Sequence, residues 1–458
     1  MSRLDQVYAG APVWAQNAMC SAEGWRLRVQ RFPPGFGQLL AQVEARMEWS
    51  EAQVTSARLA RLRAMLVHAG KHVPYWRELF AELSFRPERI QHESELGVLP
   101  LLTKDVVVAQ ADRMRAERVP SIAGAAISSQ TSGTTGAGLT FAMSEAASRH
   151  QWAVCWRFRR WHGLQRGTWC AQLGGRTVVP PAQRKPPYHR TNLPGRQLFL
   201  SGYHLSPATA GAYLDEIERQ RIPWIHGYPS LIVLLADAAR GRSWPRLRWI
   251  TLASENVTEG QRQRIESGFG IRPVEHYAQT EAVANASQRP DGGLCFDDDL
   301  SVVELVDDEA QLGTLQTRRI VGTSLDNWHM PFIRYDTGDL ATVREDGPYL
   351  APGRAVVEID GRREDYVVLA DGTMIGRTDH IFKKLTFVRE AQIRQQRRGA
   401  VSIHVVPRGQ WTDAHEAQLR DEAAARLRPE TQVSVVVEER LLRTGAGKLR
   451  LVVREGSD

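Results

Sequence analysis

Residues 128–138 carry the most recognisable chemistry in this chain, because they combine three glycines with six serine or threonine hydroxyls. Glycine lets the backbone take positive φ and approach a ligand closely. Successive backbone N–H groups in such a loop can converge on one anion, and the hydroxyls add uncharged donors. The stretch is therefore suited to holding the phosphates of a nucleotide. An ordinary Ser/Thr/Gly turn has the same composition, so the loop needs partners elsewhere in the chain.

The flanks of this loop argue against two well-known phosphate-binding motifs. A Walker loop has a lysine after its last glycine and lies between a strand and a helix, whereas Ala137 follows Gly136 here. Residues 125–129 and 139–143 both have the pattern of short strands. A strand–loop–strand arrangement fits neither a Walker loop nor a dinucleotide-binding fingerprint.

Two acidic motifs further along the chain are candidate partners for the loop. Residues 277–281 (Tyr-Ala-Gln-Thr-Glu) end a predicted strand, which is where α/β sheets bind ligands, and Glu281 is suited to a magnesium ion that bridges phosphates. Residues 334–340 place Asp339 after a glycine, where its carboxylate could accept two ribose hydroxyls. The simpler alternatives are a surface glutamate at a helix start and a common Thr-Gly-Asp turn.

Two basic motifs complete the set. Residues 361–365 (Gly-Arg-Arg-Glu-Asp) lie where the composition changes, and they are either a hinge or a charged linker. Residues 443–450 place Lys448 on a glycine-rich loop, from which a lysine can reach into a cleft as a mobile charge. A flexible basic tail is the alternative for this last motif.

The five motifs, in this order and over most of the chain, resemble those of the adenylate-forming superfamily of acyl-CoA synthetases and nonribosomal adenylation enzymes. Residues 72–77 and 99–104 look like the N-terminal region of phenylacetate–coenzyme A ligases. Further stretches resemble the branch of that family found with capsular or exopolysaccharide biosynthesis, and they are residues 199–205, 226–230, 322–323 and 330–335.

The resemblance implies an ATP- and Mg²⁺-dependent ligase that adenylates a carboxylic acid and then passes the acyl group to a thiol, with coenzyme A as the default acceptor. Thr280 would contact the α-phosphate and Glu281 would bind Mg²⁺. Asp339 and Arg362 would hold the ribose, and Lys448 would bridge the carboxylate and the α-phosphate. The β- and γ-phosphates would lie on Thr131, Ser132, Gly133, Thr134, Thr135 and Gly136.

The remaining roles are also implied by the resemblance. Asp365 would be the hinge of a rotating C-terminal domain, and Gly372 would lie beside the coenzyme A channel. The acyl pocket would be lined by Tyr228, Ala253, Ser254, Tyr277 and Ala278, which suggest an aromatic or other modest-sized acid. The nucleotide site would also include Ser254, Glu255, Tyr277, Ala278 and Gln279.

The chain departs from the family pattern at several positions. Ala137 stands where a lysine often follows the phosphate loop, so Arg184 or Lys185 would have to supply that charge. Gln279 stands where an apolar residue is common, which hints at a polar substrate. Asp336 replaces a basic residue that often precedes Thr-Gly-Asp. The four cysteines form no C-x-x-C pair, so we expect no zinc site.

Length and composition indicate the number of domains and the class of protein. A chain of 458 residues should form more than one domain. Its net charge of +7 is spread thinly, and we interpret the short basic runs at 157–160 and 394–398 as solvated surface rather than a nucleic-acid site. No apolar run approaches the roughly 20 residues of a membrane span, and residues 1–14 lack the core of a signal peptide. We therefore expect a cytoplasmic protein without integral membrane contact; a homodimer stays open.

The expected fold class is α/β, with a large N-terminal domain over residues 1–361 and a small mobile α+β domain over 362–458. Residues 1–50 receive no assignment. Helices are expected at 51–69 and 145–162, the second with an aromatic stripe in the core, and a long basic loop at 176–203. Strands at 222–225, 247–253 and 272–277 alternate with helices at 231–239 and 261–268, which predicts a parallel sheet; residues 300–345 are expected to be mostly β.

The sequence leaves two alternatives to a coenzyme A ligase open. The acyl group could pass to a carrier protein, an amine or a sugar in polysaccharide or secondary metabolite assembly. The chain could also be a degenerate, non-catalytic binding protein, although the presence of Glu281, Asp339 and Lys448 argues against this.

Overall fold

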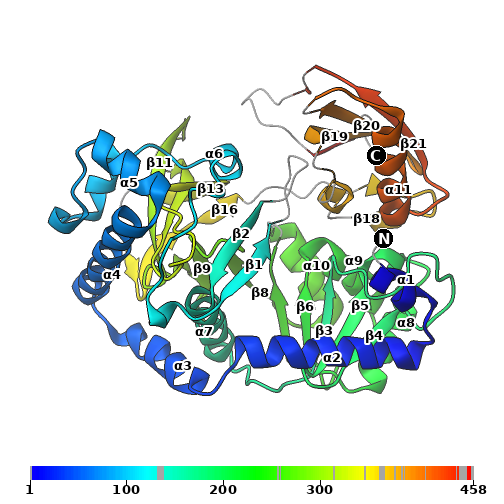
Figure 1. Ribbon diagram of the computed structural model, residues 1–458. Helices are drawn as coiled ribbons and strands as arrows, with labels where there is room; N and C mark the ends of the chain where they lie inside the picture. Colours follow the sequence, from blue (N-terminus) through cyan, green and yellow to red (C-terminus); the bar gives the residue numbers. More distant parts are fainter. Residues whose placement is uncertain are drawn as a thin grey trace.

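The computed structural model describes residues 3–131, 139–254, 257, 259–312, 315–344, 347–360, 367–375, 378–382, 385, 387–407, 409–439, 441–442 and 451–454. Figure 1 shows the expected α/β fold, with a large N-terminal part and a smaller C-terminal part that stands beside it. Within the described residues, no helix is long and apolar enough to cross a membrane.

The large part is built on a ten-stranded sheet in the order β14-β15-β10-β9-β8-β7-β6-β3-β5-β4. Strands β5, β3, β6, β7 and β8 run parallel to one another, as the alternation of strands and helices predicts, and β4 and β9 flank them antiparallel. The strands are β3 (Cys170–Gly174), β4 (His189–Asn192), β5 (Gln197–Ser201), β6 (Trp224–Gly227), β7 (Trp249–Leu252), β8 (Val274–Ala278), β9 (Asn285–Gln288), β10 (Leu294–Phe296), β14 (Tyr349–Leu350) and β15 (Gly353–Val356).

Helices α8 (Ala210–Arg219), α9 (Pro229–Ala239) and α10 (Glu259–Phe269) connect the parallel strands. Their apolar faces bury Leu214, Leu235 and Ile265 against Ile225 and Ile250 of the sheet, which gives the sheet its core. The expected elements are present with bounds shifted by a few residues. Residues 176–203 are not one long loop, however, because β4, β5 and a short helical turn at Gly202–His204 lie within them.

A second, four-stranded antiparallel sheet follows in the order β11-β12-β13-β16. Its strands are β11 (Ser301–Leu312), β12 (Leu315–Ser324), β13 (Tyr335–Arg344) and β16 (Glu358–Asp360). The sequence patterns underestimated these strands: Thr337-Gly338-Asp339 lies inside β13 rather than in a turn. Gly338 has a φ of 73°, and the pairing of β12 with β13 shifts register between Arg319 and Val321, which explains how the motif bends within the strand.

Helices of the first 161 residues wrap the two sheets. They are α1 (Arg3–Gly10), α2 (Val13–Arg31), α3 (Phe36–Ala45), α4 (Glu51–His72), α5 (Pro74–Glu82), α6 (Lys104–Ala109) and α7 (Glu145–Trp161). The sequence patterns left residues 1–50 unassigned; the described part, 3–50, forms three α-helices and a short 3-10 turn at Arg46–Glu48, and α4 continues through Gly70. Thr103 caps α6, since its hydroxyl accepts from the Val106 N–H. Helix α2 lies beside β4, where the Asn17 side chain accepts from Thr191 N at 2.9 Å.

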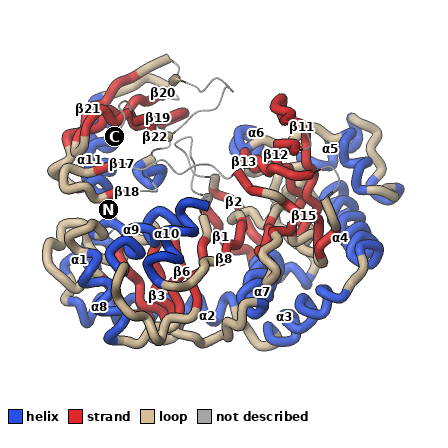
Figure 2. The backbone as a smooth tube through the Cα atoms, turned by 180° about the vertical axis from the view of Figure 1, so that it is seen from behind, coloured by secondary structure: helices blue, strands red, loops and turns tan. Residues whose placement is uncertain are grey.

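The C-terminal part has a four-stranded sheet in the order β21-β20-β19-β22 and one long helix. Its elements are β19 (Val388–Arg397), β20 (Ala400–Pro407), α11 (Asp413–Leu427), β21 (Gln432–Val437) and β22 (Val452–Arg454), preceded by the hairpin β17 (Val367–Val368) and β18 (Met374–Ile375). Figure 2 shows this hairpin between the two parts. Asp413 and Glu416 do not form a capping box, because Thr412 is the N-cap and accepts from His415 N.

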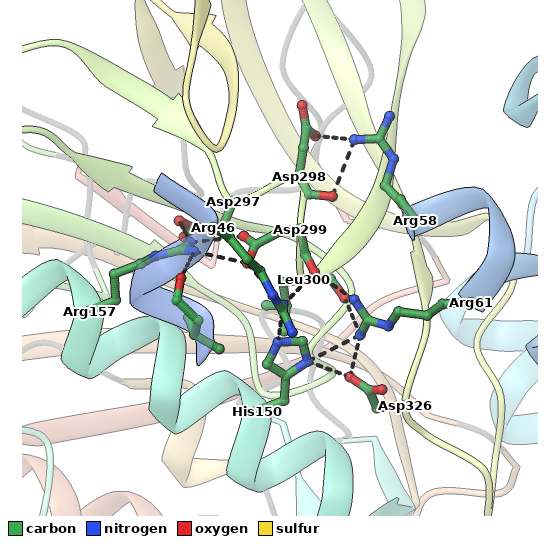
Figure 3. A network of polar contacts seen from close by, with 11 residues as sticks. Arg46, Arg58, Arg61, His150, Arg157, Asp297, Asp298, Asp299, Leu300 and Asp326 are labelled. Carbon is green, nitrogen blue, oxygen red and sulfur yellow. Dashed lines mark hydrogen bonds and ion pairs between the residues drawn. The ribbon is translucent and has the colours of Figure 1, made fainter. Parts of the chain in front are cut away.

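A buried charged network joins the helices to the sheets (Figure 3). Arg157 of α7 is fully buried and binds Asp299 through both terminal nitrogens, at 2.9 Å each, and Asp297 at 2.8 Å. Arg58 and Arg61 of α4 reach Asp298 and Asp326, and Asp326 also contacts His150. The basic run 157–160 is therefore not solvated surface: Arg157 and Arg159 point into the protein, and Arg160 is exposed.

Candidate active site

The phosphate-loop candidate lies on an antiparallel hairpin of β1 (Ala126–Gln130) and β2 (Thr140–Ser144). Thr131 N donates to Leu139 O at 2.9 Å, and Leu139 N donates to Thr131 Oγ1 at 3.1 Å. This pair closes the base of the loop, so the strand–loop–strand arrangement is confirmed and a Walker loop is excluded. Five of the predicted phosphate-binding residues lie outside the described residues: Ser132, Gly133, Thr134, Thr135 and Gly136.

Asp339 meets two other predicted site residues, although β8 and β13 belong to different sheets. The Tyr277 hydroxyl and the Gln279 side-chain N–H both donate to Asp339 Oδ2, each at 2.8 Å. Burial, and then the Asp339 carboxylate, raise the pKa of Tyr277, so its hydroxyl keeps its proton. The carboxylate is thereby held in one orientation, which suits an acceptor for ribose hydroxyls.

Glu281 lies close by, with an exposed fraction of only 9%. The Tyr335 hydroxyl, from the start of β13, donates to Glu281 Oε1 at 3.2 Å. A carboxylate oriented by a neutral donor keeps its negative charge for a cation, and Mg²⁺ is usually bound by one or two carboxylates together with substrate phosphates. The residue type and its setting therefore fit a magnesium ligand. Tyr335 belongs to the motif at residues 334–340, but sequence reasoning gave it no role, because its partner Glu281 lies in another motif.

A cavity of about 890 Å³ opens beside these residues. Five of the predicted site residues line it: Ala253, Ser254, Ala278, Gln279 and Thr280. They come from the carboxyl ends of β7 and β8, as the rule for parallel sheets requires. Two predicted acyl-pocket residues do not line it. Tyr277 turns toward Asp339, and Tyr228 lines a separate small cavity with Tyr203 and Ile375.

The far side of this cavity comes from residues that sequence reasoning did not select. His226, Thr251 and His276 line it from the sheet, and Arg159 and Trp152 line it from α7. The helix that the sequence assigned to the core therefore also forms a cavity wall. Burial, and then the nearby Arg159, lower the pKa of both His226 and His276 to about 3. Both histidines are consequently neutral at physiological pH.

Other predicted residues are placed away from the loop or lie outside the described residues. Arg184 pairs with Glu430 of the C-terminal part and lines a different cavity. Gly372 lies in the turn between β17 and β18 with a φ of 82°, a conformation that favours glycine. The described residues do not include Glu255, Arg362, Asp365 or Lys448.

No family model matches the chain. It is 22% identical over 370 residues to Protein CapK of Staphylococcus aureus, covering 80% of this chain and 79% of that protein. Among solved structures it is similar to 2-hydroxyisobutyryl-CoA ligase in complex with 2-HIB-AMP and CoA in the thioesterification state, at 19% identity and a TM-score of 0.57, covering 90% of this chain and 91% of that one. The same ligase in the postadenylation state with R3-HIB-AMP gives 18% identity and a TM-score of 0.53, with the same coverage. The fold of this chain is therefore that of an adenylate-forming acyl-CoA ligase.

Proposed function

We propose that this chain adenylates a carboxylic acid with ATP and then transfers the acyl group to a thiol, with coenzyme A as the default acceptor. The convergence of Tyr277 and Gln279 on Asp339, with Gln279 also lining the large cavity, carries the proposal. Residues from two sheets and two distant motifs meet there. A common turn or a surface glutamate, the alternatives for each motif alone, does not account for that meeting.

The chemistry requires stabilisation of negative charge at phosphorus. Attack of the acid on the α-phosphate adds charge there, and preplaced donors lower the barrier. Thr280, exposed at the cavity, would donate to the α-phosphate, and Asp339 would hold the ribose. Glu281 would bind Mg²⁺, which supplies charge neutralisation at the phosphates. Arg362 and Lys448 would complete the site from the C-terminal segment, Lys448 between the carboxylate and the phosphate.

A second class of acceptor is also a candidate. The motif resemblance to the branch associated with capsular and exopolysaccharide biosynthesis favours, as a second candidate, transfer to a carrier protein, an amine or a sugar. The domain division at 361/362, with a hinge at Asp365, belongs to the same proposal. Rotation of the C-terminal part would withdraw Lys448 and bring Gly372 to the thiol channel.

Pyrophosphate release over a panel of carboxylic acids, with and without coenzyme A, tests the proposal. We expect release that depends on one class of acid and increases with coenzyme A. Asp339→Asn should raise the KM for ATP by about 10- to 100-fold, since a hydrogen bond to a charged group contributes about 1.5–3 kcal/mol. Asp307→Asn is the control, because Asp307 lies in β11 of the same sheet with its side chain 81% exposed.

The outcomes separate the candidate functions. Acid-dependent pyrophosphate release that no thiol increases would favour the second class of acceptor, which is a carrier protein, an amine or a sugar. ATP binding without release, for every acid, would contradict an adenylating activity and leave a binding protein.

A further inference from the structure

Two arginines face the cavity without an acidic partner. Arg31 ends α2 and Arg159 lies in the last turn of α7, and both line the 890 Å³ cavity. Their guanidinium groups lie over aromatic rings: Arg31 is 4.4 Å from the ring of Trp152, and Arg159 is 4.8 Å from Trp156 and 4.9 Å from Trp224. Among the described side chains, no carboxylate lies within 4.0 Å of either guanidinium.

Arg157, two residues away on α7, shows what a structural arginine looks like in this protein. It is fully buried and binds Asp297 and Asp299. Arg159 is almost as buried, with 8% exposed, yet its guanidinium lies over aromatic faces. A cation–π contact contributes about 0.5–2 kcal/mol, whereas desolvating an ion costs several kcal/mol. The guanidinium of Arg159 therefore retains its donors for an anion that enters the cavity.

The two arginines also affect each other. Burial is the main cause that lowers the pKa of Arg31 to about 10, and the charges of Arg176 and Arg159 add to it. A negative group placed between Arg31 and Arg159 would relieve this repulsion. The cavity is thus electrostatically prepared for an anion on this side.

Two neutral histidines lie at the same place. His276 is 7% exposed, its Nδ1 lies 3.1 Å from Ser287 Oγ, and its Nε2 has no hydrogen-bond partner within the described part of the chain. His226 lies beside it, and Arg159 acts on the pKa of both rings. Ser287 Oγ donates to Asp297 Oδ2, so the single proton of the neutral His276 ring lies on Nδ1 and Nε2 is an acceptor, which leaves the two arginines as the donors for an anion.

The remaining charged groups at the cavity lie elsewhere. Glu145 begins α7, fourteen residues before Arg159 and therefore roughly 20 Å along the helix, where its carboxylate accepts from Ala125 N. Arg26, at the other end of the wall, pairs with Glu23 at 2.7 Å. Positive charge thus predominates near Arg31 and Arg159, away from the Glu145 end.

We propose that Arg31 and Arg159 bind a second anionic group of the substrate, so that the acid is a dicarboxylate or a carboxylic acid carrying phosphate or sulfate. The proposal rests on the proposed function for the first carboxyl group, which would react near Thr280 on the same cavity. A guanidinium presents a planar fork of donors that matches carboxylate and phosphate alike. The chemistry shared by these substrates is therefore the second anion.

Matched substrates test the subsite. Pyrophosphate release is measured with dicarboxylates and with monocarboxylates of equal length, and with phosphorylated and unphosphorylated hydroxy acids. We expect the doubly charged member to be preferred at least tenfold in kcat/KM. The charged series that gives the larger ratio identifies the anion. Equal rates for both members of every pair would overturn the proposal.

Arg159→Met keeps an apolar stem between the tryptophans and removes the charge. We expect it to raise the KM for the doubly charged acid at least tenfold and to leave the singly charged analogue unchanged. Arg160→Gln is the matched control, since Arg160 is exposed on the same helix and pairs with Glu44. An equal loss for both kinds of acid would mean that Arg159 acts only in the structure. Arg31→Met gives the same test at a less buried position if Arg159→Met does not fold.

Calorimetric titration of the same acids without ATP separates the two proposals. Binding of a doubly charged acid that weakens in Arg159→Met supports the subsite even if no acid releases pyrophosphate, in which case the proposed function fails alone. Pyrophosphate release with uncharged-tail acids only would keep the proposed function and overturn the subsite.

Discussion

At the residue scale, each acidic side chain of the candidate site is oriented by a tyrosine from another element. Tyr277 of β8 donates to Asp339 in β13, and Tyr335 of β13 donates to Glu281 beyond β8. The two hydrogen bonds therefore run in opposite directions: one from β8 to β13, the other from β13 to the segment that follows β8. Because neither hydroxyl carries charge, each positions a carboxylate without neutralising it.

This reciprocal arrangement predicts separable effects. Tyr335→Phe should raise the Mg²⁺ concentration needed for half-maximal pyrophosphate release by about tenfold or more, since groups that orient a metal ligand typically affect affinity by 10–100-fold. Tyr277→Phe should instead raise the KM for ATP and leave the Mg²⁺ dependence unchanged. A magnesium titration at saturating ATP, compared with an ATP titration at saturating Mg²⁺, distinguishes them. If both variants shift both curves equally, the tyrosines stabilise the fold and do not orient individual ligands.

The sequence indicated these carboxylates but not the large cavity beside them, which Gln279 and Thr280 line. Residues 277–281 and Asp339 come together because the first motif follows a parallel strand and the second bends within a paired strand. Arg31 and Arg159 come from two helices that are far apart in the chain, and an arginine in an amphipathic helix has the same pattern whether it faces water or a cavity. Their proposed role in anion binding can be inferred only from the structure, which shows the tryptophan rings that flank them.

At the element scale, the turn 297–299 joins α4 and α7 to the sheets through three consecutive buried aspartates. Asp299 receives Arg157 and Arg46, and these charges lower its pKa well below the usual range despite burial. Asp297 shares Arg157 but has less compensation, so burial raises its pKa to about 6. The sequence could not reveal this, because a run of aspartates and a run of arginines both resemble solvated loops until they are paired.

The two aspartates should respond oppositely to pH. Asp299→Asn should cost about 3–5 kcal/mol of unfolding free energy, as for a broken buried pair. That cost should be constant from pH 7.5 to 5 and shrink below about pH 4, where the unfolded carboxyl takes up its proton. Asp297 binds a proton in the folded state first, so its contribution to stability grows as the pH falls through 6, and the cost of Asp297→Asn should grow from pH 7.5 to 5. Urea unfolding at these pH values measures the stability cost of each variant. If the two costs change with pH in parallel, the roles given to Asp299 and Asp297 are contradicted.

At the scale of the whole molecule, the C-terminal part docks on the large part through the end of α11. Arg428 donates to Tyr203 O at 2.7 Å, and Arg426 donates to Thr177 Oγ1 at 2.8 Å. Arg428 also pairs with Asp371 within the C-terminal part, at 2.8 Å. A cavity of about 450 Å³ lies at this contact, lined from both parts by residues that include Arg184 and Asp371. The α/β pattern and the smaller C-terminal part were predictable from the sequence. This docking contact was not, because it joins two arginines to a backbone carbonyl and a threonine hydroxyl that no motif identifies.

Under the proposed function, this contact and Lys448 serve different half-reactions. The docked face carries Asp371 and the neighbouring Gly372, the glycine assigned to the thiol channel, so Arg428→Ala should slow thioester formation from supplied acyl-AMP by about tenfold or more. Two charge-assisted hydrogen bonds are lost, each contributing about 1.5–3 kcal/mol, and 1.4 kcal/mol corresponds to a factor of ten. Adenylation, measured as pyrophosphate release, should change little.

Lys448→Ala should do the reverse, with severe loss of adenylation and little effect on the thioester step. Arg420→Gln is the control, because Arg420 lies on the same helix and pairs with Glu416 within it. Equal loss of both steps in either variant would contradict two alternating positions of the C-terminal part.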